Sequence, residues 1–147
     1  MPILNRLHFQ PNIRLLHREG PKIKVRIGLP SIMAQQLKQQ GKKLPLIEGE
    51  ALVDTGASIS AVDRQVFQQL AISPIGVVTV RSPTIPQQQN LYPVTFIFPE
   101  LRLTAESTGV IGSNLLNQGI VALIGRDLLT KFVFIYNGSS GSFTLAF

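Results

Sequence analysis

Charged and aliphatic residues alternate over residues 22–29, the most regular pattern in the chain. A period of two residues is typical of a β-strand with one buried face, and Pro30 ends this segment. A second strand is expected over residues 43–54, and its last part, 51–53, is apolar throughout, as in a central strand. Further short strands are expected at residues 75–80, 91–98, 101–106, 109–111, 120–124, 132–136 and 142–147.

Short helices are expected between these strands. Ser31 can cap a helix that continues to residues 38–40, and Asp63 can cap a helix over residues 64–70. A third short helix is expected over residues 125–131. Many short strands with few short helices predict a mainly-β fold.

Length and composition indicate one globular domain. The chain has 147 residues, of which 44% are hydrophobic, and it contains no cysteine. Disulfides, thiol nucleophiles and cysteine-ligated metals are therefore excluded. No apolar run approaches the roughly 20 residues that cross a bilayer. The first ten residues lack the apolar centre of a secretory signal, so we expect a cytoplasmic location.

The positive charge is concentrated at the start of the chain. The net charge is +6, and residues 1–43 hold nine of the 14 Lys and Arg residues but only one acid, Glu19. We expect residues 1–20 to form a basic, loosely ordered leader and residues 21–147 to form the folded domain. A basic arm can bind nucleic acid or an anionic membrane. Few aromatic residues accompany the bases, so we favour a solvated surface and expect no nucleic-acid partner.

The triplet Asp54-Thr55-Gly56 follows the apolar run at 51–53 and carries the most specific chemistry in the chain. An aspartate at the end of a buried strand can serve as an acid–base carboxyl group, and a glycine next to it allows close approach of another backbone. Peptide hydrolysis by this route needs two carboxyl groups that share one proton. The triplet occurs once, so the second aspartate would come from a second copy of the chain.

Residues 51–58, Ala-Leu-Val-Asp-Thr-Gly-Ala-Ser, resemble the active-site strand and loop of retroviral-type, or retropepsin-like, aspartic proteases. Residues 122–129, Ala-Leu-Ile-Gly-Arg-Asp-Leu-Leu, resemble the second signature of the same family. The resemblance spans roughly residues 22–147 and includes small cellular members of the family. It implies a mainly-β acid-protease fold with one half-site lobe per chain, and a homodimer that hydrolyses an extended peptide or protein substrate without a metal or other cofactor.

The resemblance also implies roles for individual residues. Asp54 would be catalytic, and Thr55 and Gly56 would support the active-site loop, with Thr55 reaching across to the partner subunit. The implied substrate-binding residues are Gly56, Ala57 and Ser58 in the loop and Leu52, Val121 and Leu123 around an apolar pocket.

Two features depart from the family pattern. The hairpin around residues 82–90 stands where the family has its glycine-rich flap, but here the tip carries Pro83, Pro86 and three glutamines. In retroviral relatives the arginine of the second signature pairs with an acid shortly after the catalytic loop, whereas the equivalent residue here is Ser58. Arg126 therefore needs another acceptor, such as a carbonyl group or an acid of the partner chain.

Other interpretations remain open. A catalytically silent retropepsin-like module that binds a peptide or a partner protein would have the same sequence pattern. Asp127 is expected to cap a helix, and Ser58 and Ser60 have no histidine partner in sight for serine hydrolase chemistry. His8 and His17 are not expected to bind metal. The terminal strand at residues 142–147 is expected to be an unpaired sheet edge that forms the dimer, because family dimers interleave their terminal strands.

Overall fold

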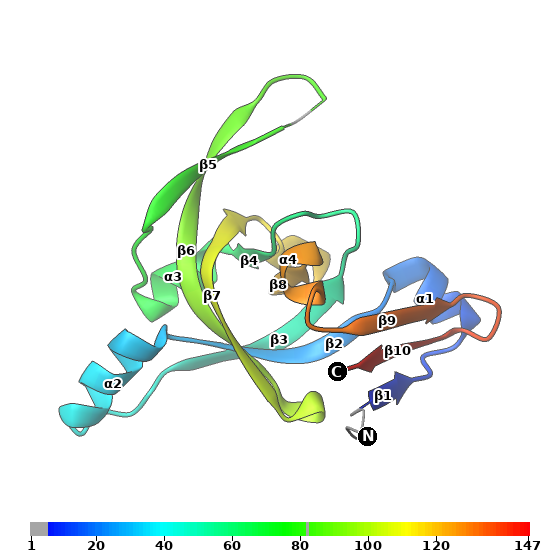
Figure 1. Cartoon of the computed structure of the whole chain (residues 1–147), viewed down its shortest axis with the longest axis horizontal. Helices are drawn as coiled ribbons and strands as arrows, with labels where there is room; N and C mark the ends of the chain where they lie inside the picture. Colours follow the sequence, from blue (N-terminus) through cyan, green and yellow to red (C-terminus); the bar gives the residue numbers. More distant parts are fainter. Residues whose placement is uncertain (1–5, 82) are drawn as a thin grey trace.

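The structure is a computed structural model that describes residues 6–81 and 83–147, and it contains two β-sheets. The larger sheet has seven strands in the order β2-β3-β8-β4-β7-β6-β5, and the smaller sheet has three strands in the order β1-β10-β9 (Figure 1). The strands of the larger sheet are β2 (Lys22–Gly28), β3 (Leu46–Val53), β4 (Ala61–Asp63), β5 (Gly76–Val80), β6 (Gln87–Phe98), β7 (Leu103–Ser113) and β8 (Ala122–Ile124). The strands of the smaller sheet are β1 (Arg6–Phe9), β9 (Val133–Asn137) and β10 (Ser142–Ala146).

The expected alternation in β2 is confirmed. Ile23, Val25 and Ile27 are buried, at most 4% exposed, while Lys24 and Arg26 face solvent. This strand pairs antiparallel with β3 along its whole length and with β6 over its last three residues. One face of the ribbon therefore joins the main core, whose largest fully buried side chains include Phe96 and Phe98 of β6.

Strand β8 lies between β3 and β4 and organises the centre of the large sheet. It runs parallel to β3, with Leu52 opposite Leu123, and antiparallel to β4. The apolar segments with which the two sequence signatures begin are thus direct neighbours in space. The short strand β4 was not expected from the sequence, because three residues between a loop and a helix carry no periodic signal.

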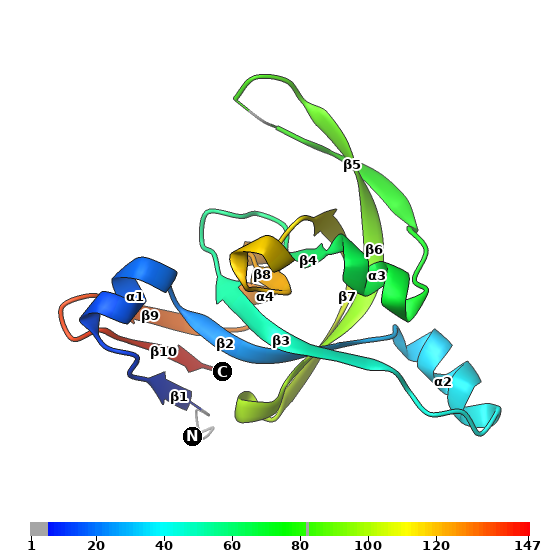
Figure 2. The same ribbon diagram turned by 180° about the vertical axis from the view of Figure 1, so that it is seen from behind.

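The long hairpin β5–β6 projects away from the rest of the large sheet (Figures 1 and 2). Its strands pair from Gly76 opposite Leu91 to Val80 opposite Gln87. The glutamines at 87–89 were expected at the tip, but they belong to β6, because backbone pairing with β5 continues beyond the apolar pattern. Ser82 at the tip lies outside the described residues.

Four α-helices and two 3-10 turns are present among the described residues. The helices are α1 (Ile13–Glu19), α2 (Ser31–Gln39), α3 (Arg64–Leu70) and α4 (Arg126–Leu129), and the turns are η1 (Pro99–Leu101) and η2 (Leu116–Gln118). None of the helices in residues 6–81 and 83–147 combines the length and apolar character needed to cross a membrane.

Only one of the three expected helix caps is confirmed. The side chain of Asp63 caps α3 by accepting a 2.9 Å hydrogen bond from the amide of Gln65. Ser31 is instead the first residue of α2, and its amide and hydroxyl both donate to Glu106, at 3.0 and 2.5 Å. Asp127 likewise lies inside the first turn of α4, where its carboxylate holds a neighbouring loop. In both cases the side chain bonds to a residue far away in the sequence, so the local sequence did not reveal its role.

The described part of the leader is ordered by contacts with the other end of the chain. Strand β1 pairs with β10 from Arg6 opposite Ala146 to Phe9 opposite Phe143, and the rings of Phe9 and Phe143 stack with centroids 4.6 Å apart. Leu16 of α1 is 1% exposed and belongs to the main core. Residues 6–19 therefore differ from the loosely ordered segment that the sequence suggested, because their order depends on a partner strand far away in sequence. Residues 1–5 of the leader lie outside the described part.

The terminal strand β10 is the centre of the small sheet, which corrects the expectation of an unpaired edge. It has β1 on one side and β9 on the other. Phe143 and Leu145 were expected to become buried only against a partner chain. They are 2% and 1% exposed within a single chain. The hairpin β9–β10 was predicted correctly, but the position of β1 beside it was not.

Candidate active site

Asp54 stands immediately after β3, where the strand leaves the sheet. Its amide donates a 2.9 Å hydrogen bond to the carbonyl of Ile124 in β8, and the preceding Val53 amide donates to Pro21 at 2.9 Å. The backbone that carries the carboxyl group is thus fixed on both sides. The side chain itself is only half-buried, so it can reach a substrate.

The residues after Asp54 form a tight turn around its carboxylate. The amide of Gly56 donates to Oδ1 of Asp54 at 2.9 Å, and the amide of Ala57 donates to the carbonyl of Asp54 at 3.3 Å. Thr55 and Gly56 are exposed at the apex of this loop. A methyl group added to Gly56 would stand 3.1 Å from Oδ1, so the glycine keeps space beside the carboxylate.

A buried hydrogen-bond cluster holds the end of the same loop. Ser60 is fully buried; its amide donates to both oxygens of Asp127 at 3.0 Å, and its hydroxyl donates to Oδ1 at 2.7 Å. The Ser60 hydroxyl also accepts a 2.9 Å bond from the amide of Gly125. A side chain at Gly125 would collide with the backbone of residues 57–60, at 2.9–3.0 Å. The loop and the second signature therefore pack backbone against backbone.

Arg126 ties the apex of the loop to α4. Its Nη1 donates a 2.7 Å hydrogen bond to the carbonyl of Thr55, and its amide donates to the carbonyl of Ala57 at 2.8 Å. The sequence had predicted that Arg126 would need an acceptor other than the absent acid, and a carbonyl group of its own chain takes that place. Together with Ser60, this contact supports the loop from both ends.

An apolar wall lies beside the loop. Leu52 and Leu123 are opposite each other in the β3–β8 pair and are half-buried, and Ile111 of β7 packs with them against a small cluster. That cluster consists of Ala61, Leu115 and Ile120. Ile111 was not predicted to belong to this apolar wall, because an isoleucine on a strand carries no functional signal in the sequence.

Val121 is placed differently from the other two expected pocket residues. It is 6% exposed and belongs to the main core. It covers Gly49, where an added methyl group would be 2.5 Å from Cγ1 of Val121. Leu52 and Leu123 therefore share one surface, whereas Val121 packs mainly into the protein.

Asp63 is a buried carboxylate whose hydrogen-bond partners are all backbone amides. Besides capping α3, it accepts hydrogen bonds from the amides of Leu115 and Leu116 at 2.7 and 2.8 Å. Burial alone would raise the pKa of Asp63, but these amides and that of Gln65 outweigh it and lower the pKa below its ordinary value of 3.8. The carboxylate thus stays ionised and anchors the turn that leads into β8.

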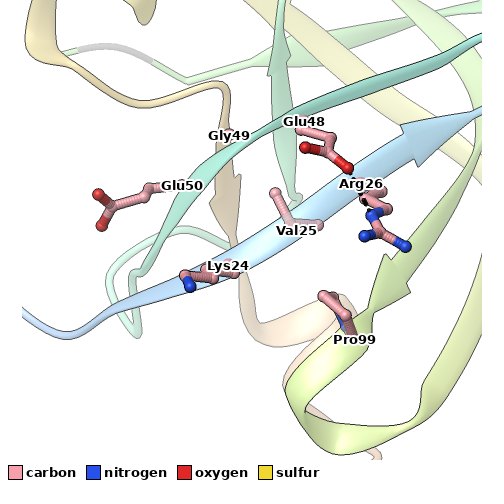
Figure 3. A pocket seen from close by; sticks show the side chains of 7 residues that line it. All are labelled: Lys24, Val25, Arg26, Glu48, Gly49, Glu50 and Pro99. Atoms are coloured by element: carbon pink, nitrogen blue, oxygen red, sulfur yellow. Dashed lines mark hydrogen bonds and ion pairs between the residues drawn. The ribbon is translucent and has the colours of Figure 1, made fainter.

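Other polar groups of the described residues lie away from Asp54. No group of three or more His, Cys, Asp or Glu side chains among residues 6–81 and 83–147 is arranged to hold a metal ion. Nδ1 of His8 is 2.9 Å from the hydroxyl of Thr144. A pocket of about 420 Å³ lies over β2 and β3, where Arg26 and Glu48 form a 2.8 Å ion pair (Figure 3). Its lining residues are Lys24, Val25, Arg26, Glu48, Gly49, Glu50 and Pro99, so it is separate from the Asp54 loop.

Comparisons with known proteins support the fold. No protein-family model and no curated protein sequence matches the chain. The chain is similar to the crystal structure of a retropepsin-like aspartic protease from Rickettsia conorii, with a TM-score of 0.54 and 16% identity over 99% of this chain and 93% of that chain. It is also similar to the solution structure of the Simian Foamy Virus (mac) protease, with a TM-score of 0.45 and 18% identity over 75% of this chain and 92% of that chain. The similarity to the Rickettsia conorii protease, which spans nearly the whole chain, shows the retropepsin-like fold, mainly β with short helices, as expected from the two sequence signatures.

Proposed function

We propose that this protein is an aspartic endopeptidase that works as a homodimer, with one Asp54 from each chain. The observation that carries the proposal is the way in which the chain presents Asp54. The carboxylate stands half-buried at the end of a central strand, on a loop that Ser60 and Arg126 hold in place. A carboxylate that a substrate can reach, on a loop whose backbone is held rigidly by hydrogen bonds, is typical of a catalytic site.

The proposed reaction uses two carboxyl groups that share one proton. Two Asp54 side chains brought together across a two-fold axis cannot both ionise readily, so the pair holds one proton. The ionised carboxylate takes a proton from a water molecule, which attacks the carbonyl carbon of the peptide bond. The protonated carboxyl group donates its proton to the carbonyl oxygen. The resulting diol then breaks its carbon–nitrogen bond. The leaving amine takes up the proton that the first carboxylate removed from water, and the other product is a carboxylic acid.

The proposed substrate is an extended peptide or protein segment. Its backbone would pair with Gly56, Ala57 and Ser58 in the manner of an added strand. Leu52 and Leu123 would contact an apolar side chain next to the cut bond, with Val121 behind them. Thr55 would contact the partner subunit, and the β5–β6 hairpin would cover the substrate as a flap. The absence of cysteine fits a cytoplasmic setting, which we propose as the place of action.

The decisive experiment compares the wild-type chain with Asp54→Asn on a diverse peptide library. Loss of the carboxyl group is expected to lower hydrolysis by at least about 10³-fold, because a homodimer of the variant has no carboxyl group at the site to supply either proton transfer. Glu48→Gln, which removes a carboxylate in the ion pair with Arg26, is the control and should keep full activity.

Circular dichroism should show that both variants fold, since Asp54 is not a core residue. Hydrolysis that survives in Asp54→Asn would refute the proposal. Peptide binding by the wild-type chain without any cleavage would favour the alternative of a silent peptide-binding module.

A further inference from the structure

A small polar pocket lies where the β5–β6 hairpin meets α3 and β7. It has a volume of about 210 Å³ and is lined by Arg64, Gln88, Gln89, Asn90, Tyr92 and Gly112. In both views α3 lies beside the base of this hairpin (Figures 1 and 2). The pocket is smaller than the roughly 300–1,000 Å³ of sites for drug-sized molecules, so it suits a small ion better than a larger organic ligand.

Two packing contacts define the walls of this pocket. The ring of Tyr92 stacks on Phe67 of α3, with ring centroids 3.9 Å apart and an angle of 10° between the planes. A methyl group added to Gly112 would be 3.2 Å from Cγ of Arg64 and 3.5 Å from Cε2 of Tyr92. The aliphatic stem of Arg64 and the ring of Tyr92 therefore both pack over Gly112, and the glycine leaves the space between them open.

The lining side chains are rich in hydrogen-bond donors and include no carboxylate. The guanidinium of Arg64 carries a permanent positive charge and five N–H donors, and each of the three side-chain amides offers two more. Within the described residues, these four side chains form no hydrogen bond or ion pair with the rest of the chain. The neighbouring carboxylate of Asp63 does not occupy Arg64, because it is buried and accepts hydrogen bonds from three backbone amides.

We propose that this pocket binds a small oxyanion, such as phosphate or a short carboxylate, between Arg64 and the side-chain amides of β6. A planar guanidinium can donate to two oxygens of such an ion at once, and amide N–H groups can donate to the others. A cation would meet only the charge of Arg64 and no acid. The inference does not depend on the proposed function, because no residue of the Asp54 loop lines the pocket.

A bound ion would also connect the projecting hairpin to the body of the protein. Gln88 and Asn90 lie opposite Thr79 and Val77 in the paired part of the hairpin, whereas Arg64 belongs to α3. An ion that bonds to both sides would hold the hairpin against the helix. We therefore expect the backbone amides of β5 and β6 to exchange their hydrogens more slowly when the pocket is occupied.

The test is an NMR titration of the full chain with inorganic phosphate, and in parallel with acetate, at an ionic strength held constant with sodium chloride. The side-chain amide signals of Gln88, Gln89 and Asn90 should shift together and saturate, with phosphate binding more tightly because it carries more charge. Arg64→Gln should weaken this binding at least about tenfold, and Arg64→Lys, which keeps the charge but loses the planar fork, should weaken it less. Arg102→Gln removes an exposed arginine beyond the other end of β6 and should leave these shifts unchanged.

The outcomes separate a specific site from general attraction to a basic protein. The proposal would be overturned by amide signals that do not move, that never saturate, or that respond equally in Arg64→Gln. Chloride that produces the same shifts by itself would overturn it too. Should Arg64→Gln lose its folded circular dichroism spectrum, Gln88→Ala at an exposed position tests the same pocket through the other two amides.

Hydrogen exchange decides the second part of the proposal. Slower exchange in the hairpin with phosphate, absent in Arg64→Gln, would support a link between the hairpin and α3. Saturable phosphate binding with unchanged exchange would support the site and refute the link. Neither measurement uses peptidase activity, so a failure here leaves the proposed function untouched.

Discussion

At the scale of single residues, Ser60 shows how a buried hydroxyl can support an exposed catalytic loop. It is the only residue that bonds both to the carboxylate of Asp127 and to the amide of Gly125 among the hydrogen bonds of the described chain. The sequence offers no histidine partner that would make Ser60 a nucleophile, and its contact with Asp127 has no local signal. Its actual role is positional: it fixes the end of the Asp54 loop against the second signature.

Ser60→Ala should therefore weaken both stability and catalysis. Removing the hydroxyl leaves the Gly125 amide without its acceptor in a buried site, which costs about 1–3 kcal/mol in the free energy of unfolding. Urea denaturation measures this change, and peptide cleavage should show a lower kcat with little change in KM. Ser58→Ala, at an exposed position of the same loop, should change the stability by less than about 0.5 kcal/mol. Equal stability of the two variants would show that the cluster does not support the loop.

At the scale of elements, the carboxylate of Asp63 joins three segments. It ends β4, caps α3 and accepts hydrogen bonds from the amides of Leu115 and Leu116 at the start of η2. The turn at η2 leads into β8, which in turn supports Asp54 through the carbonyl of Ile124. Asp63, which lies outside the two signatures, thus helps to position β8, the strand that hydrogen-bonds to Asp54.

The lowered pKa of Asp63 predicts how stability changes with pH. Folding lowers this pKa, so the folded state binds the proton less tightly than the unfolded state does. The resulting stabilisation is complete above the ordinary value of 3.8 and is lost as the pH falls through the folded pKa. Urea unfolding of the wild type should therefore show a falling free energy below about pH 4, and Asp63→Asn should flatten that dependence while lowering stability at neutral pH. An unchanged pH profile in Asp63→Asn would assign the acid sensitivity to other carboxylates.

At the scale of the whole molecule, the single Asp-Thr-Gly triplet would make the proposed activity depend on association of two chains. One chain holds one Asp54, so an active site built from two carboxyl groups scales with the concentration of dimer. The corrected place of β10 matters here, because the terminal strand is already paired on both sides within one chain and has no free edge to offer a partner.

Mixing experiments test this dependence on assembly. A tenfold excess of Asp54→Asn over wild-type chains should reduce wild-type activity to about one tenth, because most wild-type chains then occupy mixed dimers. Wild-type activity that is unaffected by this excess would mean that one chain suffices for catalysis.

The sequence by itself determined the parts of this protein that depend on local pattern. The alternation in β2, the apolar run before Asp54, the cap at Asp63 and the hairpin β9–β10 each arise from residues close together in the chain. The retropepsin-like fold was expected from the resemblance of residues 51–58 and 122–129 to the two signatures of that family. The resemblance implied Leu52, Val121 and Leu123 as pocket residues; in the structure Leu52 and Leu123 pack against the same small cluster, whereas Val121 belongs to the main core. Their role in a site stays a prediction.

Only the tertiary structure decided the features that depend on partners far away in sequence. The order of residues 6–19 comes from β10 and the main core, and the burial of Phe143 and Leu145 comes from strands on both sides. The division of the chain at residue 20 stays a prediction about independent folding. Ser60 and Asp127 meet across the fold, and Val121 turns to the core because Gly49 leaves room for it. Contacts between distant segments leave no periodic pattern in the sequence, so only the folded structure reveals them.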